Sequence, residues 1–195
     1  MKIVDSFKVG ILQHKVSNYV ADKVENLLIP RLDQLSNKDN MVNTDYFHKK
    51  QIFELNEIPE LVEEIYKCKD YFNQTLKSHS VHHSKICGYW VQDYRNDKDH
   101  HVRHNHGKNE LSVVYWVRAD KNAGPLVIYN PIPLQSFLYS EASEPRNEYT
   151  TAAIKVSPEK GGIVMFPSCI DHSVFPSETK NCIRTTIAFN LDLYK

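Results

Sequence analysis

The sequence predicts a mainly β domain, a sandwich or barrel, braced by α-helices from its N-terminal part. After Ser84, short runs rich in β-branched and aromatic residues recur between Gly, Pro, Asn and Asp, which is typical of all-β sandwiches and barrels. Before Ser84, apolar residues recur at helical spacing. We therefore expect a single domain, residues 1–195, with a helical support region at 1–83 and a β core at 84–195.

The N-terminal region is expected to contain one short strand and two helices. Their patterns cover residues 2–13, 17–35 and 56–77. Asn56 is the predicted N-cap of the second helix, because Pro59 then falls in its first turn, where proline is tolerated.

The β core is expected to contain seven short strands. They fall within residues 85–94, 110–120, 124–130, 152–158, 161–168, 172–177 and 182–194. The stretch Pro131–Thr150 is long, polar and without a clear pattern. Loops of that length in a compact domain usually serve as lids or binding loops, or are disordered, so we expect it to form part of a substrate site.

Composition excludes several classes of protein. Lys and Arg number 24 and Asp and Glu number 24, so the net charge is zero, which argues against nucleic-acid binding driven by bulk charge. The sequence shows no apolar stretch long enough to span a membrane and no apolar segment typical of a signal peptide. The four cysteines form no CxxC pair, which predicts free thiols in a cytoplasmic, reducing compartment.

Histidines supply the first sign of a metal site. Of ten in the chain, seven fall between His79 and His106. His104 and His106 alternate on a strand-like segment, so their side chains leave the same face about 7 Å apart and can converge on one ion. Farther along, a glycine turn, a buried strand and a proline break precede His172, which is the third candidate ligand.

Arg184 is the candidate anion-binding residue. It lies in an otherwise apolar strand and alternates with Thr186 and Ala188, so these three side chains share one face. If that face lines the inside of a barrel, the guanidinium needs a carboxylate, and the sequence offers no obvious protein carboxylate nearby. A carboxylate on a bound ligand would meet this need. The alternative is that Arg184 lies on a solvated outer face.

Together these segments resemble the 2-oxoglutarate- and Fe(II)-dependent oxygenases, and most closely a branch common in phages and marine bacteria. The matching segments are His104–His106, Leu111–Trp116, Phe166–Ser168, His172–Pro176 and Arg184–Asn190. The resemblance covers roughly residues 88 to 192. It implies a double-stranded β-helix, the jelly-roll or cupin-like barrel, braced by the N-terminal helices.

The resemblance also implies roles for individual residues. His104, His106 and His172 match the iron ligands, although the position of His106 is usually Asp in the wider superfamily. Arg184 matches the arginine that pairs with the distal carboxylate of 2-oxoglutarate, and Thr186 the hydroxyl two residues beyond it. For the same co-substrate pocket the resemblance suggests Tyr94, ten residues before His104, and Tyr115 or Trp116.

The implied activity is that of a dioxygenase, most simply a hydroxylase. Its partners would be Fe(II), 2-oxoglutarate, dioxygen and an unidentified small-molecule or peptide substrate. Three neutral imidazoles provide one negative charge fewer than two histidines and a carboxylate, so anionic ligands should bind this metal more strongly. The sequence leaves the oligomeric state open.

The same residues permit other interpretations. Glu110 follows His106 at a spacing close to a cupin motif, in which three His and one Glu hold the metal, so a metal-binding cupin with His104, His106, Glu110 and His172 is the main alternative. A non-catalytic module stabilised by a metal would need Arg184 to face outward. A cysteine enzyme built on Cys169 or Cys182 lacks a predicted helix N-terminus to lower the thiol pKa.

Overall fold

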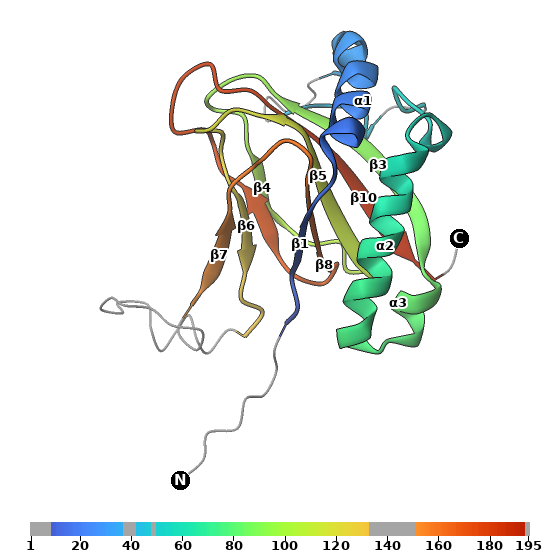
Figure 1. Cartoon of the computed structure of the whole chain (residues 1–195). Coiled ribbons are helices and arrows are strands. Elements are labelled where there is room, and N and C mark those ends of the chain that lie inside the picture. The colour runs from blue at the N-terminus through green and yellow to red at the C-terminus, as the bar shows by residue number, and fades with distance from the viewer. Residues whose placement is uncertain (1–8, 37–41, 48–49, 133–150, 194–195) are drawn as a thin grey trace.

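The computed structural model of the chain describes residues 9–36, 42–47, 50–132 and 151–193. Two antiparallel β-sheets face each other, and the N-terminal helices cover the outer side of the larger sheet (Figure 1). This arrangement confirms the predicted mainly β fold of the double-stranded β-helix type, braced by helices. Residues 2–8 of the first predicted strand and residues 133–150 of the predicted loop lie outside the described residues.

Strands distant in sequence alternate within both sheets. The larger sheet has the order β1 (Leu12–Lys15), β8 (Gly162–Pro167), β5 (Leu111–Ala119), β10 (Arg184–Asp192), β3 (Lys85–Tyr94) and β2 (Asn43–Thr44). The smaller has the order β4 (His101–His104), β9 (His172–Val174), β6 (Leu126–Tyr129) and β7 (Ala153–Val156). Strands β1 and β2 precede residue 84, so the predicted helical support region also contributes to the larger sheet.

The helical segments differ from the sequence prediction at two boundaries. They are α1 (Asn18–Leu28), the 3₁₀ helix η1 (Ile29–Gln34), the 3₁₀ helix η2 (Leu55–Glu57), α2 (Pro59–Leu76) and α3 (His79–His83). The first α-helix stops at Leu28 because Pro30 has no N–H to continue the α-helical hydrogen bonds. Asn56 is not an N-cap: it lies inside η2, whose N-terminus has a Glu54–Glu57 capping box, and the N-cap of α2 is Ile58.

Two apolar cores result from the alternation of side chains along the strands. One lies between the helices and the larger sheet, and its largest members include Phe53, Leu61, Tyr115 and Phe189. The other lies between the two sheets and contains Trp116, Leu126, Phe166 and Ile170 among others. The predicted glycine turn before β8 is present, because Gly161 adopts φ +79°, a conformation that favours glycine.

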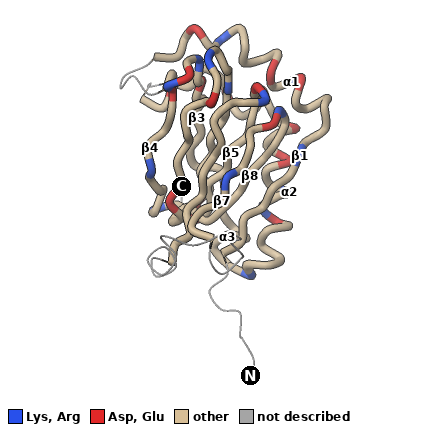
Figure 2. Tube along the Cα trace, turned by 90° about the vertical axis from the view of Figure 1, so that its left-hand side faces the viewer, with Lys and Arg blue, Asp and Glu red and all other residues tan. Residues whose placement is uncertain are grey.

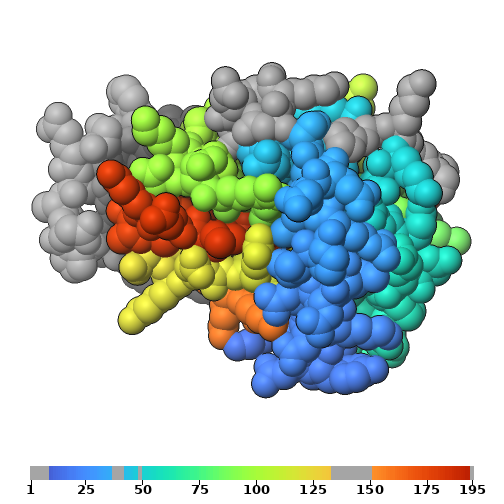
Figure 3. All heavy atoms as spheres, turned by 90° about the horizontal axis from the view of Figure 1, so that it is seen from above, coloured from blue at the N-terminus to red at the C-terminus, as the bar shows by residue number. Residues whose placement is uncertain are grey.

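Three loops close one end of the space between the sheets. Ser177 N–H donates to the Asp97 carbonyl (3.1 Å), and Asp120 N–H donates to the Ile183 carbonyl (3.0 Å). Figure 3 looks onto this end and shows these green, yellow and red segments lying side by side next to the blue α1 region. The start of β10, where Arg184 lies, is therefore at the closed end.

Acidic and basic residues do not separate into patches of one sign. Figure 2 shows acidic and basic residues interspersed along the trace, in keeping with the net charge of zero. Within the described part of the chain, no helix is both long and apolar enough to cross a membrane.

Candidate functional site

The three predicted histidine ligands lie together at the edge of the smaller sheet. His104 ends β4 and is the register partner of His172, which begins β9. His106 lies two residues beyond β4, where its N–H donates to the Ser168 carbonyl at 2.8 Å. One ring nitrogen from each residue lies within 4.8 Å of the other two, so the three imidazoles can share one ion.

Hydrogen bonds hold all three rings in the orientation that a metal requires. The Nδ1 atoms lie close to oxygen acceptors: His104 to the Val102 carbonyl (2.7 Å), His106 to Asn190 Oδ1 (2.6 Å) and His172 to the Ile170 carbonyl (3.1 Å). An Nδ1–H that donates to oxygen leaves the Nε2 lone pair for a metal.

Burial favours the neutral form of these ligands. It lowers the pKa of His172 to about 3 and also lowers the pKa of His106. The neutral imidazole is the form that coordinates a metal, so no proton needs to be displaced from these two rings near neutral pH.

Glu110 does not join this group, contrary to the cupin alternative. Within the described ranges, the three histidines form the only cluster of three or more His, Cys, Asp or Glu side chains close enough to share an ion. The Glu110 backbone is fixed elsewhere, since its N–H donates to the Leu191 carbonyl at 2.9 Å and its carbonyl accepts from Ser168 N–H at 3.1 Å.

A narrow cavity, which we call the inner cavity, extends between the sheets from the histidines toward Arg184. Its lining includes His104, His106, His172, Trp116, Arg184 and Thr186. The Arg184 side chain thus faces inward, as the alternation with Thr186 and Ala188 predicts, and it is only 2% exposed. This position excludes the solvated outer face considered for Arg184.

Arg184 is held without a protein carboxylate. Its Nη1 donates to the Gly124 carbonyl, and its Cζ lies 3.8 Å from the centroid of the Tyr94 ring. No Asp or Glu among the described residues lies within ion-pair distance of it, although the buried Asp99 favours its charged form from farther away. Its Nε is buried without a hydrogen-bond partner. The Thr186 hydroxyl is likewise buried and without a partner. The inner cavity therefore presents unsatisfied donors at its closed end.

Only glycine fits at position 124, the residue that contacts Arg184. An added Cβ would collide with the Phe175 carbonyl oxygen, so a larger residue could not bring the chain this close to β9. In the sequence, Gly124 lies at the start of the predicted strand 124–130, and no contact with the site is predicted for it. Its contact with Arg184 joins positions 60 residues apart, and no local pattern reveals such a contact.

The three aromatic residues assigned to the co-substrate pocket occupy different places. Trp116 lines the inner cavity. Tyr94 is buried against the Arg184 guanidinium, and burial raises its pKa to about 12, so it is a neutral phenol. Tyr115 lies on the opposite face of β5, in the core beneath the helices, because successive residues of a strand point to opposite faces. The assignment of Tyr115 to the pocket is therefore corrected.

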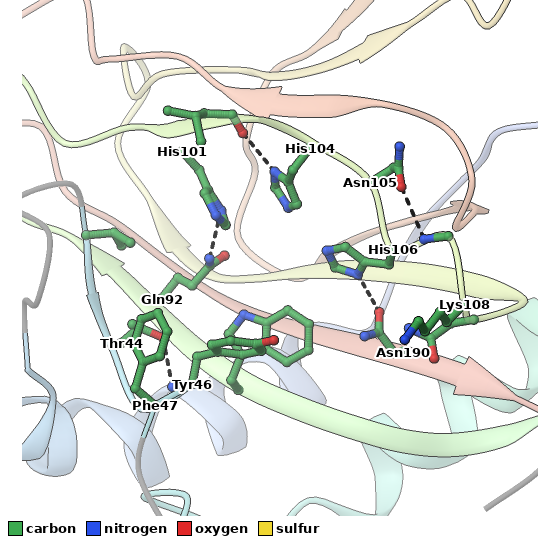
Figure 4. Close-up of a pocket in the computed structure, with 15 residues that line it drawn as sticks. Thr44, Tyr46, Phe47, Gln92, His101, His104, Asn105, His106, Lys108 and Asn190 are labelled. Atoms are coloured by element: carbon green, nitrogen blue, oxygen red, sulfur yellow. Dashed lines mark hydrogen bonds between the residues drawn. The ribbon is translucent and has the colours of Figure 1, made fainter.

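A second, wider cavity opens on the other side of the histidines, and we call it the outer cavity. Its volume is about 680 Å³, within the range of ligand pockets. Figure 4 shows its lining, which includes Tyr46, Phe47, Trp90, His104, His106 and Lys108. Trp90, Gln92, His101, His104 and His106 line both cavities, so the two meet at the candidate metal ligands.

Asn190 is a site residue to which sequence reasoning assigned no role. It follows Phe189 on β10, and its amide oxygen accepts from Nδ1 of His106 although 84 residues separate the two. Ser112, whose Oγ lies 3.3 Å from the same Nδ1, supports this contact. The Asn190 amide oxygen therefore holds the His106 ring in its present orientation.

We expect Asn190→Ala to weaken metal binding about 10- to 100-fold, since loss of a partner that orients a ligand typically has this effect. Titration of Zn(II) or Ni(II) against a competing chelator would measure it. Asn43→Ala is a matched control, because Asn43 donates to a backbone carbonyl of β3 away from the histidines. Unchanged affinity in Asn190→Ala would contradict the positioning role.

The chemistry of the residues present suits an iron ion and a dicarboxylate, but the inner cavity, at about 30 Å³, must widen before a molecule of the size of 2-oxoglutarate can enter it. Three neutral imidazoles with their Nε2 atoms free suit divalent iron and leave coordination positions open. The Arg184 Nε and the Thr186 hydroxyl, both without a hydrogen-bond partner, suit a carboxylate at the closed end of the same cavity.

Comparison with known proteins agrees with this site. Residues 88–190, more than half of the chain, match the family model described as "Putative 2OG-Fe(II) oxygenase". A search of curated proteins found no match.

Three solved structures illustrate the shared fold. An oxidoreductase of the 2OG-Fe(II) oxygenase family from Burkholderia pseudomallei is 11% identical with a TM-score of 0.61, covering 95% of this chain and 85% of that one. A prolyl-4-hydroxylase from Pseudomonas putida is 12% identical with a TM-score of 0.62, covering 95% and 94%. A prolyl hydroxylase from Trichoplax adhaerens is 13% identical with a TM-score of 0.60, covering 94% and 84%.

The family match spans the strands that carry the histidines and Arg184, and the solved structures share the arrangement of those strands. The chain therefore belongs to the 2OG-Fe(II) oxygenase family, whose members are oxidoreductases that use Fe(II) and 2-oxoglutarate.

Proposed function

We propose that this protein is a hydroxylase that binds Fe(II) through His104, His106 and His172 and anchors 2-oxoglutarate through Arg184. The single observation that carries the proposal is a buried arginine without a carboxylate partner, in one cavity with three converging histidines. A buried guanidinium is costly unless an anion pairs with it, and a dicarboxylate extending from the metal would supply that anion.

Each side chain of the inner cavity has a separate role. Bound Fe(II) and 2-oxoglutarate, with dioxygen, supply the oxidising power for insertion of oxygen into a C–H bond. Arg184 binds the distal carboxylate with charge-assisted hydrogen bonds, and Thr186 donates its hydroxyl proton to the same group. Trp116 forms an apolar wall, and the packed loops at the closed end exclude water from the ion pair.

The three hydrogen bonds that the Nδ1–H groups donate to oxygen fix the imidazoles before iron binds. A preoriented set of ligands keeps the co-substrate and the substrate in constant positions relative to the metal, which is how the protein contributes to the rate. Dioxygen, 2-oxoglutarate and an organic substrate that reaches the metal are thus the proposed partners.

The test is formation of succinate. The protein supplied with Fe(II), 2-oxoglutarate and dioxygen should convert 2-oxoglutarate to succinate, slowly without substrate and faster with it, as measured by mass spectrometry. Omission of Fe(II) is the control. Absence of succinate, together with no detectable binding of 2-oxoglutarate by the metal-loaded protein, would contradict the proposed function.

A further inference from the structure

We infer that the outer cavity binds a substrate with two parts, an apolar or aromatic body and an anionic group that pairs with Lys108. This inference rests on the proposed function, because it takes the outer cavity to be the place from which a substrate meets the metal. The two cavities differ in their lining, since Arg184 and Thr186 line only the inner one, whereas Tyr46, Phe47 and Lys108 line only the outer one.

Aromatic rings form the apolar part of the outer cavity. Trp90 on β3 is 6% exposed and lies beside His106, with ring centroids 5.7 Å apart. Tyr46 meets Trp90 edge to face at 5.0 Å, and Phe47 meets Tyr46 in the same way at 5.1 Å. Tyr46 and Phe47 are still 57% and 50% exposed, so their faces can cover an apolar ligand.

Among the described residues that line the outer cavity, the only charge is positive. Lys108 is the only Lys, Arg, Asp or Glu among the described residues that line it, and no ion pair to Lys108 is formed within the described part of the chain. The other polar lining residues are mainly amides, including Gln92, Asn105 and Asn109. Among the described lining residues a cationic substrate would find no carboxylate, and it would lie near the Lys108 ammonium group and a metal held by neutral imidazoles.

The positions of the two parts set the orientation of the substrate. In Figure 4, Tyr46 and Phe47 lie toward one end of the cavity and Lys108 toward the other, with His106 between them. A ligand with its body on the aromatic rings and its anion at Lys108 therefore passes across the metal-facing histidines. The carbon to be oxidised would lie between the two parts.

Binding of three probes of nearly equal size tests this inference without turnover. They are 3-phenylpropionate, 3-phenylpropanol and 3-phenylpropylamine, which share the phenyl ring and a short chain and end in an anionic, a neutral and a cationic group. The full chain, loaded with Ni(II) and saturated with 2-oxoglutarate, is titrated with each probe and followed by ligand-observed NMR. We expect the acid to bind at least fivefold more tightly than the alcohol, and the amine most weakly.

Variants test whether the preference for the acid depends on residues that line the outer cavity. Lys108→Gln should remove most of the advantage of the acid over the alcohol, and Lys108→Arg should retain it. Tyr46→Ala should weaken the acid and the alcohol alike, because both lose the same aromatic contact. Lys121→Gln is the matched control, since Lys121 is exposed and lies outside both cavities. Equal binding of acid and amine, no probe binding, or an acid affinity unaffected by Lys108→Gln would overturn the inference.

Binding of 2-oxoglutarate, measured on the same samples, separates this inference from the proposed function. A protein that binds 2-oxoglutarate but shows no preference for the acid overturns the substrate class alone. A protein that does not bind 2-oxoglutarate fails the proposed function, and the probes can then be titrated against the Ni(II)-loaded protein. A dependence on Lys108 there would still support an anion site.

Discussion

His172→Ala should lower the affinity for Zn(II), Ni(II) or Fe(II) by more than about 100-fold. Loss of a metal ligand costs more binding free energy than loss of a residue that only orients a ligand. His172 is 5% exposed, and its Nδ1 donates to the Ile170 carbonyl; among the described residues, the cluster that can share an ion consists of His104, His106 and His172. Metal content after purification and competition with a chromophoric chelator would measure the loss.

Glu110→Gln is the control that separates this site from a cupin centre. It removes one carboxylate from the same region of the chain, yet metal affinity should stay within about twofold of wild type, because Glu110 lies outside the ligand cluster. Thermal unfolding of both variants without metal would show that each is folded. A drop in metal content for Glu110→Gln, or wild-type affinity in His172→Ala, would contradict the three-histidine assignment.

The fold could be predicted because each local signal agreed with the global arrangement. The runs after Ser84 alternate or are short and apolar, and each became a strand, since such segments bury one or both faces in a two-sheet core. The inward position of Arg184 follows from the same two-residue period, although the register of β10 against β5 shifts between Thr185 and Thr186. Alternation also explains why Trp116 and not Tyr115 lines the inner cavity, but the sequence alone does not say which of two neighbours faces inward.

The parts of the site that depend on contacts between distant residues could not be predicted. The link from His106 to Asn190 and the link from Arg184 to Gly124 each join segments whose pairing only the folded sheets define. Likewise, Tyr46 and Phe47 lie in a segment without a strong pattern, and their place beside Trp90 follows from the pairing of β2 with β3. Spacing along the chain reveals neighbouring ligands such as His104 and His106, even though β4 ends at His104. It does not reveal the walls of a cavity.

Arg184→Ala should raise the dissociation constant for 2-oxoglutarate at least tenfold in the metal-loaded protein. A loss of about 1.4 kcal/mol already gives that factor, and loss of one member of a buried charge pair usually costs more. Arg184→Lys should restore binding only in part, because an ammonium group cannot reproduce the planar fork of a guanidinium. Anaerobic calorimetry would measure both constants, and Arg31→Ala is the matched control because Arg31 pairs with Glu57 beside the helices.

Thermal unfolding distinguishes a ligand-binding arginine from a structural one. Without 2-oxoglutarate, Arg184 is a buried cation with no carboxylate within ion-pair distance, which is a costly arrangement. Burial lowers its pKa, and this effect outweighs the opposite effects of Tyr94 and Asp99. Arg184→Ala should therefore leave the Tm of the metal-loaded, 2-oxoglutarate-free protein unchanged or raise it. Adding 2-oxoglutarate at 100 times its dissociation constant should stabilise the wild type by about 2.7 kcal/mol, and the same concentration should stabilise the variant much less. A lower Tm without 2-oxoglutarate, combined with an unchanged response to it, would assign Arg184 to the structure of the barrel rather than to the co-substrate.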